Sequence, residues 1–440
     1  MTNISTDKPS AAEMLSFGGA QFATSIYSAF TSYYLMMFLT DIALVAPATT
    51  AVLLLGYRLF SAVDTQFLGV FINQKSFRDG KYRPYYRLIA LPFALSMAAL
   101  GLIPQINASF RVSYAVIILI ICDLCWTTLN LATNSMLPYL AQDDISRSKF
   151  VSFSNSSSII AYIVVGTFTL PSVGFIGGGD MANGFAQILM LLSLLTIPLF
   201  IFAYFRLKER YYVEPRSKTA IIDIYRTIFG NKKFLLFITG FCFYFIADAF
   251  KNQTTYYYVS YVLKRPELLP FLVLSGLISP LAMQPIIPRL LRIAKKSILI
   301  VFGLLATSLC WLLLLPFGDK PIAMFPFIAL YGVFTSISAN LVYTVLASFS
   351  DDIRLSRNIN MSEIITAALN LSSNLGNGIA SWTSALVIAA YGYSALADSQ
   401  SAEALFGIKT TYIVYTAICM AISGFILLFY HRKYERKPNR

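Results

Sequence analysis

The sequence predicts an all-α membrane protein with twelve transmembrane helices in two six-helix bundles. Composition is the first observation: of 440 residues, 57% are hydrophobic and only 12% are charged. Soluble domains carry roughly 25% charged residues, so this chain has too few to cover a water-facing surface. The other two observations are the repeated apolar runs of span length and one long polar break near the middle. A single soluble core is excluded, because such cores stop growing near roughly 250–300 residues.

Each predicted helix is an apolar run of about twenty residues or more, the length that crosses a bilayer with its backbone groups paired. The runs cover residues 17–41, 46–73, 84–104, 112–140, 150–174, 184–205, 234–263, 267–288, 297–317, 321–349, 362–391 and 405–430. The longest polar break divides them six and six, as in transporters made of two helical bundles. We therefore expect an N-terminal bundle (1–205), a basic central loop (206–233), a C-terminal bundle (234–430) and a basic tail (431–440).

Lysine and arginine are distributed unequally between alternate loops. The basic loops are residues 75–87, 147–149, 206–233, 289–296, 354–357 and 432–440. Positive residues stay on the cytoplasmic side, so both termini and the central loop are expected in the cytoplasm. The net charge of +13 then follows from topology and from contact with anionic lipid. No nucleic-acid partner is expected, because the basic loops lack the interleaved aromatic residues of a single-strand binder.

Residue types that carry catalysis or bind metals are scarce in the predicted spans. The single histidine, His431, lies in the basic tail. Cys122 and Cys125 form a CxxC without a second ligand pair, and cysteines in apolar runs usually serve as small buried hydrophobic residues. No nucleophile–base pair or metal-ligand set is evident. We therefore expect no enzymatic activity, no metal and no cofactor.

The loop after the second predicted span reads Arg78-Asp79-Gly80-Lys81-Tyr82-Arg83-Pro84-Tyr85. Further motifs are Thr40-Asp41, Leu170-Pro171, Gly177-Gly178-Gly179-Asp180 and Tyr257-Tyr258-Val259-Ser260-Tyr261-Val262. Together they resemble the glycoside–pentoside–hexuronide:cation symporters (melibiose permease-like) of the major facilitator superfamily, over most of the chain. The resemblance implies the major facilitator fold, sugar transport and a bacterial inner (plasma) membrane. It also implies a gating loop that contains Arg78, Gly80, Lys81 and Arg83.

The sequence departs from this family at the positions of the cation and sugar sites. Ser61 and Thr65 stand where the family has two carboxylates on the second span. Asn130 replaces an aspartate of the fourth span, Ser25 occupies the sugar-binding position of the first, and Asn374 replaces a lysine of the eleventh. Neutral oxygens do not balance the charge of sodium, so sodium coupling is not expected at these positions. They suit hydrogen bonding to a hydroxyl-rich solute; the alternative is that they only pack helices.

Charges occur instead at other positions of the predicted spans: Arg58, Asp64, Asp123, Asp248 and Lys251. Charged residues are costly in mid-membrane and usually face a cavity where they act in function. Asp64 is expected to carry a proton or an ion, with Arg58 as its partner. Asp248 and Lys251 are three residues apart, so they share a helix face and form a candidate substrate or gating pair. The alternative is a structural pair that locks two helices together.

The predicted function is a secondary active transporter that moves a sugar, glycoside or related hydroxylated solute by alternating access. The substrate-binding candidates are Ser25, Trp126, Asn130, Asp248, Lys251 and Asn374, with Trp126 as an aromatic platform. The ion-coupling candidates are Arg58, Ser61, Asp64, Thr65 and Asp123. A proton is favoured over sodium, because an isolated carboxylate binds a proton without further ligands.

The expected partners of this chain, which we take to be monomeric, are its small-molecule substrate and the lipid bilayer. Two alternative functions stay open on the same fold. One is transport or export of an amphiphile such as a lysolipid, a glycolipid or a natural product. The other is a transporter-like sensor that binds its ligand without moving it.

Overall fold

The computed structural model describes residues 10–74, 77–141, 144–210, 230–283, 286–357, 362–397 and 399–435. Within these residues the regular secondary structure consists of helices, without a strand. The predicted central loop, 206–233, is described only at its two ends, and the predicted tail only as far as residue 435. The remaining parts of the loop and the tail lie outside the described residues.

The contacts divide the chain into two compact units. The first unit comprises Met1–Ser32, Ile42–Val45 and Val63–Arg216, and the second comprises Tyr33–Asp41, Ala46–Ala62 and Ser217–Arg440. The division falls inside two helices, α1 (Ala11–Tyr33) and α3 (Pro47–Gln74). Each of these helices therefore has one part packed with the first unit and another part packed with the second.

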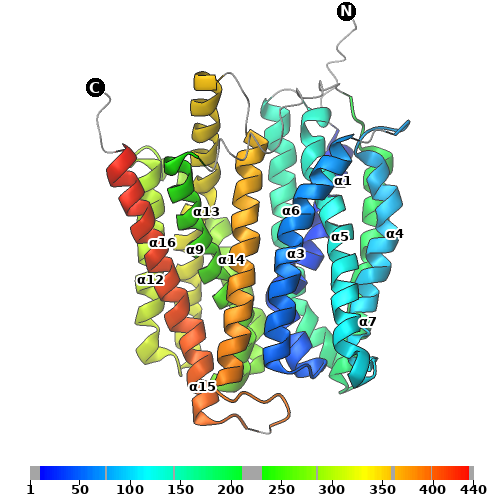
Figure 1. Cartoon of the computed structure of the whole chain (residues 1–440), viewed down its shortest axis with the longest axis vertical. Coiled ribbons are helices and arrows are strands. Elements are labelled where there is room, and N and C mark those ends of the chain that lie inside the picture. Colours follow the sequence, from blue (N-terminus) through cyan, green and yellow to red (C-terminus); the bar gives the residue numbers. More distant parts are fainter. Residues whose placement is uncertain are drawn as a thin grey trace, which may run out of the picture. The chain divides into compact units, whose positions relative to one another are not determined.

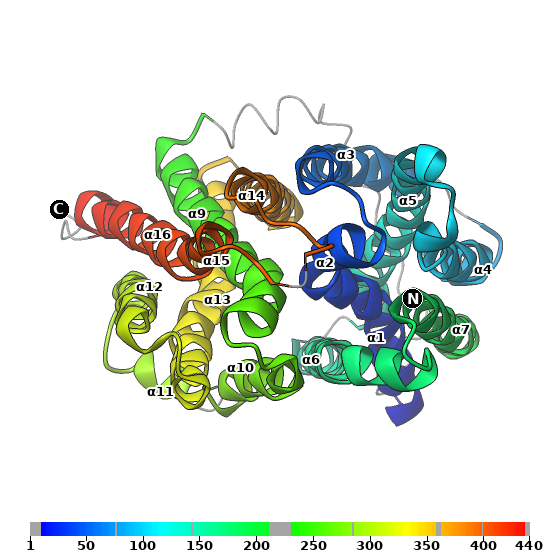
Figure 2. The ribbon, with the colours of Figure 1, turned by 90° about the horizontal axis from the view of Figure 1, so that it is seen from below.

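The first unit contains four further long helices, which Figures 1 and 2 show from the side and from the end. They are α4 (Arg83–Leu100), α5 (Ala108–Leu140), α6 (Asp144–Ile176) and α7 (Met181–Arg206). Helix α4 packs along α5 and α7, and α6 packs along α7. Aromatic rings fill the α4–α7 interface: Tyr86 stacks on Phe200, and Phe93 meets the same ring edge-on.

The second unit begins with α2 (Leu35–Met37) and the π-helical segment η1 (Phe38–Ile42), which follow α1. Its other elements are α9 (Lys232–Tyr257), η3 (Tyr258–Val262), η4 (Pro266–Leu268), α10 (Leu269–Met283), α11 (Ile287–Leu290), α12 (Lys296–Leu313), η5 (Leu315–Phe317), α13 (Pro321–Arg357), α14 (Ser362–Ala390), α15 (Ala402–Lys409), η6 (Thr410–Tyr415), α16 (Thr416–Tyr430) and η7 (His431–Glu435). Helix α9 packs along α14 and α16, α12 packs along α13 and α16, and α10 packs along α13. Figure 2 shows α9 next to α14 and α16.

The long helical segments follow the order of the predicted spans. In the described residues, nine of them are long and apolar enough to cross a membrane: α3, α5, α6, α7, α9 with η3, α10 with η4, α12 with η5, α13, and α15 with η6, α16 and η7. The other three predicted spans correspond to α1, α4 and α14. Serine, threonine and asparagine lower the hydropathy of α1 and α14, while Arg83 and Arg87 lower that of α4.

The end of α6 and the start of α7 both contain glycine and pack closely against each other, which forms a tight hairpin. A Cβ atom added to Gly184 would lie 2.3 Å from the carbonyl oxygen of Val173, so no larger residue fits there without a shift. Asp180 begins α7 by accepting hydrogen bonds from the backbone N–H groups of Ala182 and Asn183, at 2.9 and 3.2 Å. Such a side-chain cap satisfies amide groups that the helix leaves unpaired. Together the close approach and the cap fix the hairpin.

Candidate functional site

One face of α9 carries polar side chains that packing leaves partly open. Asp248, Lys251, Asn252 and Tyr256 are spaced i, i+3, i+4 and i+8, which places them on one side of the helix. All four are half-buried, whereas Ala249, among the buried residues, helps to form the packed side. The two charged residues predicted to share a helix face therefore do lie on a polar face of the second unit.

Tyr331 of α13 links the two charged side chains of this face. Its hydroxyl donates to Asp248 Oδ1 at 3.0 Å, and the centre of its ring lies 4.6 Å from Lys251 Nζ. Asn252 donates from Nδ2 to Asp248 Oδ2 at 2.8 Å. Each oxygen of Asp248 thus has a neutral donor, while the ammonium group of Lys251 is stabilised by an aromatic face. The described ion pairs include none between Asp248 and Lys251, which meet through Tyr331 instead.

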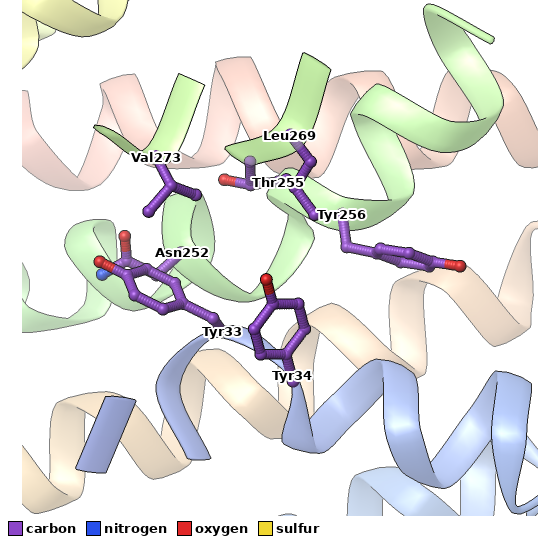
Figure 3. A pocket seen from close by; sticks show the side chains of 7 residues that line it. All are labelled: Tyr33, Tyr34, Asn252, Thr255, Tyr256, Leu269 and Val273. Carbon is purple, nitrogen blue, oxygen red and sulfur yellow. The ribbon is translucent and has the colours of Figure 1, made fainter. Parts of the chain in front are cut away.

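A pocket lies next to this face and is also part of the second unit. Its lining consists of Tyr33, Tyr34, Asn252, Thr255, Tyr256, Leu269 and Val273. In Figure 3 the ring of Tyr33 lies beside the amide of Asn252, and the hydroxyl of Tyr34 points toward the helix that carries Thr255. The pocket combines aromatic rings with an amide and hydroxyl groups. Asn252 belongs to both features, so the polar face and the pocket form one continuous surface, which we call the α9 site.

A second cluster lies inside the first unit and contains two carboxylates. Asp64 of α3 is 5% exposed, and Asp123 of α5 is fully buried. Asp123 is the charged group that acts on Asp64, and Thr127 lies on the same face of α5 one turn later. Thr65 donates to Asp64 Oδ1 at 3.3 Å. Two neighbouring carboxylates repel each other when both are charged, so such a pair is a candidate site for a proton or a cation.

Two of the other predicted residues of the first unit, Ser25 and Trp126, bond between helices, whereas Asn130 bonds within its own helix. Ser25 of α1 donates to Ser158 of α6 at 2.9 Å. The indole N–H of Trp126 donates to the carbonyl oxygen of Thr24 at 3.0 Å. Asn130 accepts a hydrogen bond from the amide of Asn134 one turn later on α5. The contacts of Ser25 and Trp126 are therefore between helices. The side chain of Asn130 is half-buried, and its described hydrogen bond is with Asn134 rather than with Asp64 or Asp123.

The predicted residues Arg58, Ser61 and Asn374 belong to the second unit, while Thr65 lies with Asp64 in the first. The guanidinium group of Arg58 lies 5.2 Å from the ring centre of Tyr57. Its stem packs on α14, since a Cβ atom at Gly378 would lie 2.9 Å from Arg58 Cβ. Ser61 is buried, and Asn374 is half-buried on α14. The predicted partners Arg58 and Asp64 are thus members of different units.

The predicted gating loop between α3 and α4 is held by the residue Glu209, which follows α7. Its carboxylate accepts hydrogen bonds from the backbone N–H groups of Lys81 and Tyr82, each at 2.7 Å, and of Arg83 at 2.9 Å. These amides form the N-terminus of α4, where a helix leaves its N–H groups unpaired and favours negative charge. A residue distant in sequence therefore caps α4.

Arg83 reciprocates this cap at the other helix. Its Nε and Nη2 atoms donate to the carbonyl oxygen of Tyr204, in the last turn of α7, at 3.1 and 2.9 Å. Gly80 makes the loop possible, because its φ of +128° is unfavourable for other residues and a Cβ there would lie 2.9 Å from Glu209 Oε1. Lys81 lies near the ring of Tyr139, and Arg78 is exposed on the loop. Of the four predicted loop residues, three are thus ordered by contacts within the first unit.

The sequence-based candidates omitted three residues that organise these sites: Asn252, Tyr331 and Glu209. Asn252 could have been found, because it lies one helical turn after Asp248. Tyr331 and Glu209 reach their partners across 83 and 126 to 128 residues of sequence. No local pattern reports contacts of that range.

A helical chain with many spans, whose charged side chains face the interior of its units, has the features of a polytopic membrane transporter. The profile of the MFS/sugar transport protein family matches residues 16–432, and the chain belongs to this family. The resemblance found in the loop motif, the fold class and the class of secondary transporter for sugar-like solutes are confirmed.

The chain is similar along nearly its whole length to proteins named as transporters or carriers. It is 25% identical to the isoprimeverose transporter of Lactiplantibacillus pentosus, over 95% of this chain and 88% of the relative. It is 21% identical to the glucuronide carrier protein homolog of Escherichia coli, over 93% of this chain and 90% of the relative. Among solved structures, the nucleoside transporter NupG superposes with a TM-score of 0.66, at 14% identity, over 97% of this chain and all of NupG. These relatives are transporters, not enzymes, as the sequence predicts.

Proposed function

We propose that this chain carries a glycoside or a related hydroxylated sugar across the bacterial inner membrane, by alternating access and with both termini in the cytoplasm. The α9 site is the observation that carries the proposal. It offers a carboxylate and an amide, which bond hydroxyl groups, beside the phenol rings of Tyr33 and Tyr34, which stack on the apolar faces of sugar rings. The names of the two sugar-transporting relatives agree with this chemistry.

In this proposal the second unit supplies Asp248, Lys251, Asn252 and Asn374 to the substrate. The first unit supplies Ser25 and Trp126, whose present contacts between helices would loosen when the substrate arrives, and Asn130, whose present contact lies within α5. The two bundles, 1–205 and 234–430, would move relative to each other as the two halves of a monomeric transporter do.

We further propose that the Asp64–Asp123 pair couples transport to protons. Asp123 is the charged neighbour of Asp64 in the described residues, and Asp64 Oδ2 has no hydrogen-bond partner there. A proton added to the pair removes the repulsion of two carboxylates, whereas sodium would require several more oxygen ligands at this position. Arg58, Ser61 and Thr65 would tune the region as α3 changes its packing.

The substrate proposal is tested by uptake and counterflow of isoprimeverose, a glucuronide and, as a nucleoside comparison, uridine. Asp248→Asn keeps the shape of the site but removes the charge that accepts from Tyr331 and from a substrate hydroxyl. We expect the KM for the transported sugar to rise about tenfold or more, because a hydrogen bond to a charged group contributes about 1.5–3 kcal/mol.

The matched control is Asp319→Asn, which removes an exposed carboxylate whose partner is Lys409 at 3.1 Å. Surface pairs of this kind contribute little, so wild-type kinetics are expected. Equal kinetics for Asp248→Asn and Asp319→Asn would refute the α9 site. Counterflow of uridine but of neither sugar would refute the substrate class.

A further inference from the structure

A partly buried hydrogen-bond network joins three segments of the second unit that are far apart in sequence. Asp41 of η1 accepts hydrogen bonds from the hydroxyl groups of Tyr261, at 2.9 Å, and Tyr393, at 2.7 Å. Thr40 donates to the same carboxylate at 2.7 Å and also bonds the hydroxyl of Tyr257. We call Asp41, Tyr261 and Tyr393 the Asp41 latch.

The aromatic rings around the latch also pack on one another. Tyr257 stacks on Tyr261, and Tyr393 stands edge-on to both rings. The tyrosines come from α9, η3 and the turn after α14, whereas Asp41 comes from the segment that follows α1. The latch therefore links the end of the first span to the seventh and eleventh spans.

The residues immediately after Asp41 are attached to the first unit instead. Arg111 of α5 donates from Nη1 to the carbonyl oxygen of Ala43 at 2.6 Å, and from Nη2 to that of Pro104 at 3.2 Å. Leu44, directly after the second attachment, has a φ of +52°, which is unusual for a residue other than glycine. A single residue, Ile42, thus separates an attachment to the second unit from an attachment to the first.

The pocket of the α9 site is partly lined by the segment that contains Asp41. Tyr33 and Tyr34 line the pocket and belong with Asp41 to the stretch Tyr33–Asp41 that packs with the second unit. Thr255, on the opposite wall, is 7% exposed. Release of this stretch would uncover Thr255, whereas the contact of Arg111 with Ala43 would stay within the first unit.

From this arrangement we propose that the Asp41 latch is the gate that closes the α9 site at the end of the first span, and that it opens by separating Asp41 from Tyr261 and Tyr393. The role rests on the proposed function, because it assumes alternating access. In the closed state the hydroxyl groups of Tyr261 and Tyr393 replace water that the carboxylate would otherwise bind. In the open state water takes their place, so the two states differ little in free energy and a substrate can shift the balance.

The test measures access to the pocket and requires no substrate. Thr255→Cys serves as a reporter in the purified full-length protein, and its reaction with a bulky water-soluble maleimide is followed over time. The signal of the parent without Thr255→Cys, which contains only the five native cysteines, is subtracted. Asp41→Asn and, separately, Tyr393→Phe are then introduced. We expect about tenfold faster labelling for Asp41→Asn and a smaller increase for Tyr393→Phe, and tenfold corresponds to about 1.4 kcal/mol in the closing equilibrium.

Two controls separate a gate from a general loosening. Tyr258→Phe removes a neighbouring tyrosine hydroxyl that bonds Gly318 at 2.8 Å and not Asp41, so its labelling rate should equal that of the parent. Ser372→Cys reports on the packed α9–α14 interface, where Ser372 bonds the carbonyl oxygen of Ile238. Its labelling should stay unchanged in all latch variants.

Unchanged labelling of Thr255→Cys in both Asp41→Asn and Tyr393→Phe overturns the gate. An equal rise at Thr255→Cys and Ser372→Cys also overturns it, since the latch would then only stabilise the fold. If Asp41→Asn does not fold, Tyr393→Phe alone decides by the same two readouts. Because labelling does not depend on a transported solute, a failure of the sugar proposal would leave this result intact.

Discussion

At the scale of single residues, Tyr331 has two roles in the α9 site that different parts of its side chain carry. The hydroxyl holds Asp248, and the ring faces Lys251. A charged residue inside a membrane protein must be satisfied by its neighbours, because no bulk water is available to it. Tyr331 does so for an anion through its hydroxyl group and for a cation through its ring.

Tyr331→Phe should therefore weaken substrate binding and leave the fold intact. The substitution keeps the ring over Lys251 but removes the hydroxyl from Asp248, which then loses one of its two described donors. We expect the KM for the transported sugar to rise about threefold to tenfold, because one hydrogen bond contributes about 0.5–1.5 kcal/mol. Initial rates of uptake over a range of sugar concentrations measure this.

Tyr114→Phe is the matched control for that measurement. Its hydroxyl bonds the carbonyl oxygen of Ala99 in the first unit, at 3.0 Å, away from both clusters. The KM of Tyr114→Phe should equal that of the parent. A lower maximal rate with an unchanged KM in Tyr331→Phe would contradict the role assigned to the hydroxyl, since it would point to the transport step rather than to binding.

At the scale of elements, α4 and α7 cap each other. Glu209, just after α7, accepts from the first amides of α4, and Arg83, at the start of α4, donates to a carbonyl in the last turn of α7. Tyr82 occupies the N-cap of α4 and provides no side-chain cap of its own. The charges also match the helix dipoles, with an anion at an N-terminus and a cation at a C-terminus.

Glu209→Ala should destabilise the protein by about 1–2 kcal/mol, because it removes an N-terminal cap and a favourable charge–dipole interaction together. Thermal unfolding of the purified protein in detergent would detect this as a lower melting temperature. Glu403→Ala is the control, since Glu403 lies in the first turn of α15 while Ser401 supplies the cap there. Equal melting temperatures for the two variants would show that the cap of α4 does not depend on Glu209.

The sequence predicts the helices of this fold well, and its contacts between helices poorly. Apolar runs report helices because the lipid solvent requires both apolar side chains and an internally paired backbone. The change from α1 to the π-helical η1 near Tyr34 has no such signal, since neither glycine nor proline marks it. Asp41 shows the same limit for a site: its partners Tyr261 and Tyr393 are 220 and 352 residues away, so only the folded chain brings them together.

At the scale of the whole molecule, each unit contains its own group of charged side chains within its helices. The first unit holds the Asp64–Asp123 pair, and the second holds Asp248 and Lys251 around Tyr331. In the second group a cation accompanies the anion. In the first, Asp123 is the charged group that acts on Asp64 among the described residues, and both Asp64 and Asp123 are buried. This difference is why we propose the first pair for ion coupling and place the second group in the proposed substrate site.

A transporter built in this way should accumulate its sugar in response to a proton gradient and not to a sodium gradient. In proteoliposomes, an imposed pH gradient should drive uptake above equilibrium, and a sodium gradient at equal pH on both sides should not. The reason is chemical. One proton directly removes the repulsion between two carboxylates. A sodium ion needs a shell of several oxygen ligands, and Ser61, Thr65 and Asn130 offer only neutral oxygens. Asp64→Asn should abolish the accumulation and leave counterflow, which moves sugar without net proton flux.

The two readouts together distinguish loss of coupling from loss of transport. If Asp64→Asn lost counterflow as well, the carboxylate would be needed for the movement of the bundles or for the fold, and not for coupling alone. If a sodium gradient drove accumulation in the parent protein at equal pH, the proton assignment would be wrong. The carboxylates at positions 64 and 123 would then have to serve as ligands of a cation, and Asp123→Asn should weaken the dependence on sodium concentration. Measuring both gradients in the parent and in Asp64→Asn therefore separates a proton-coupled carrier from a sodium-coupled one.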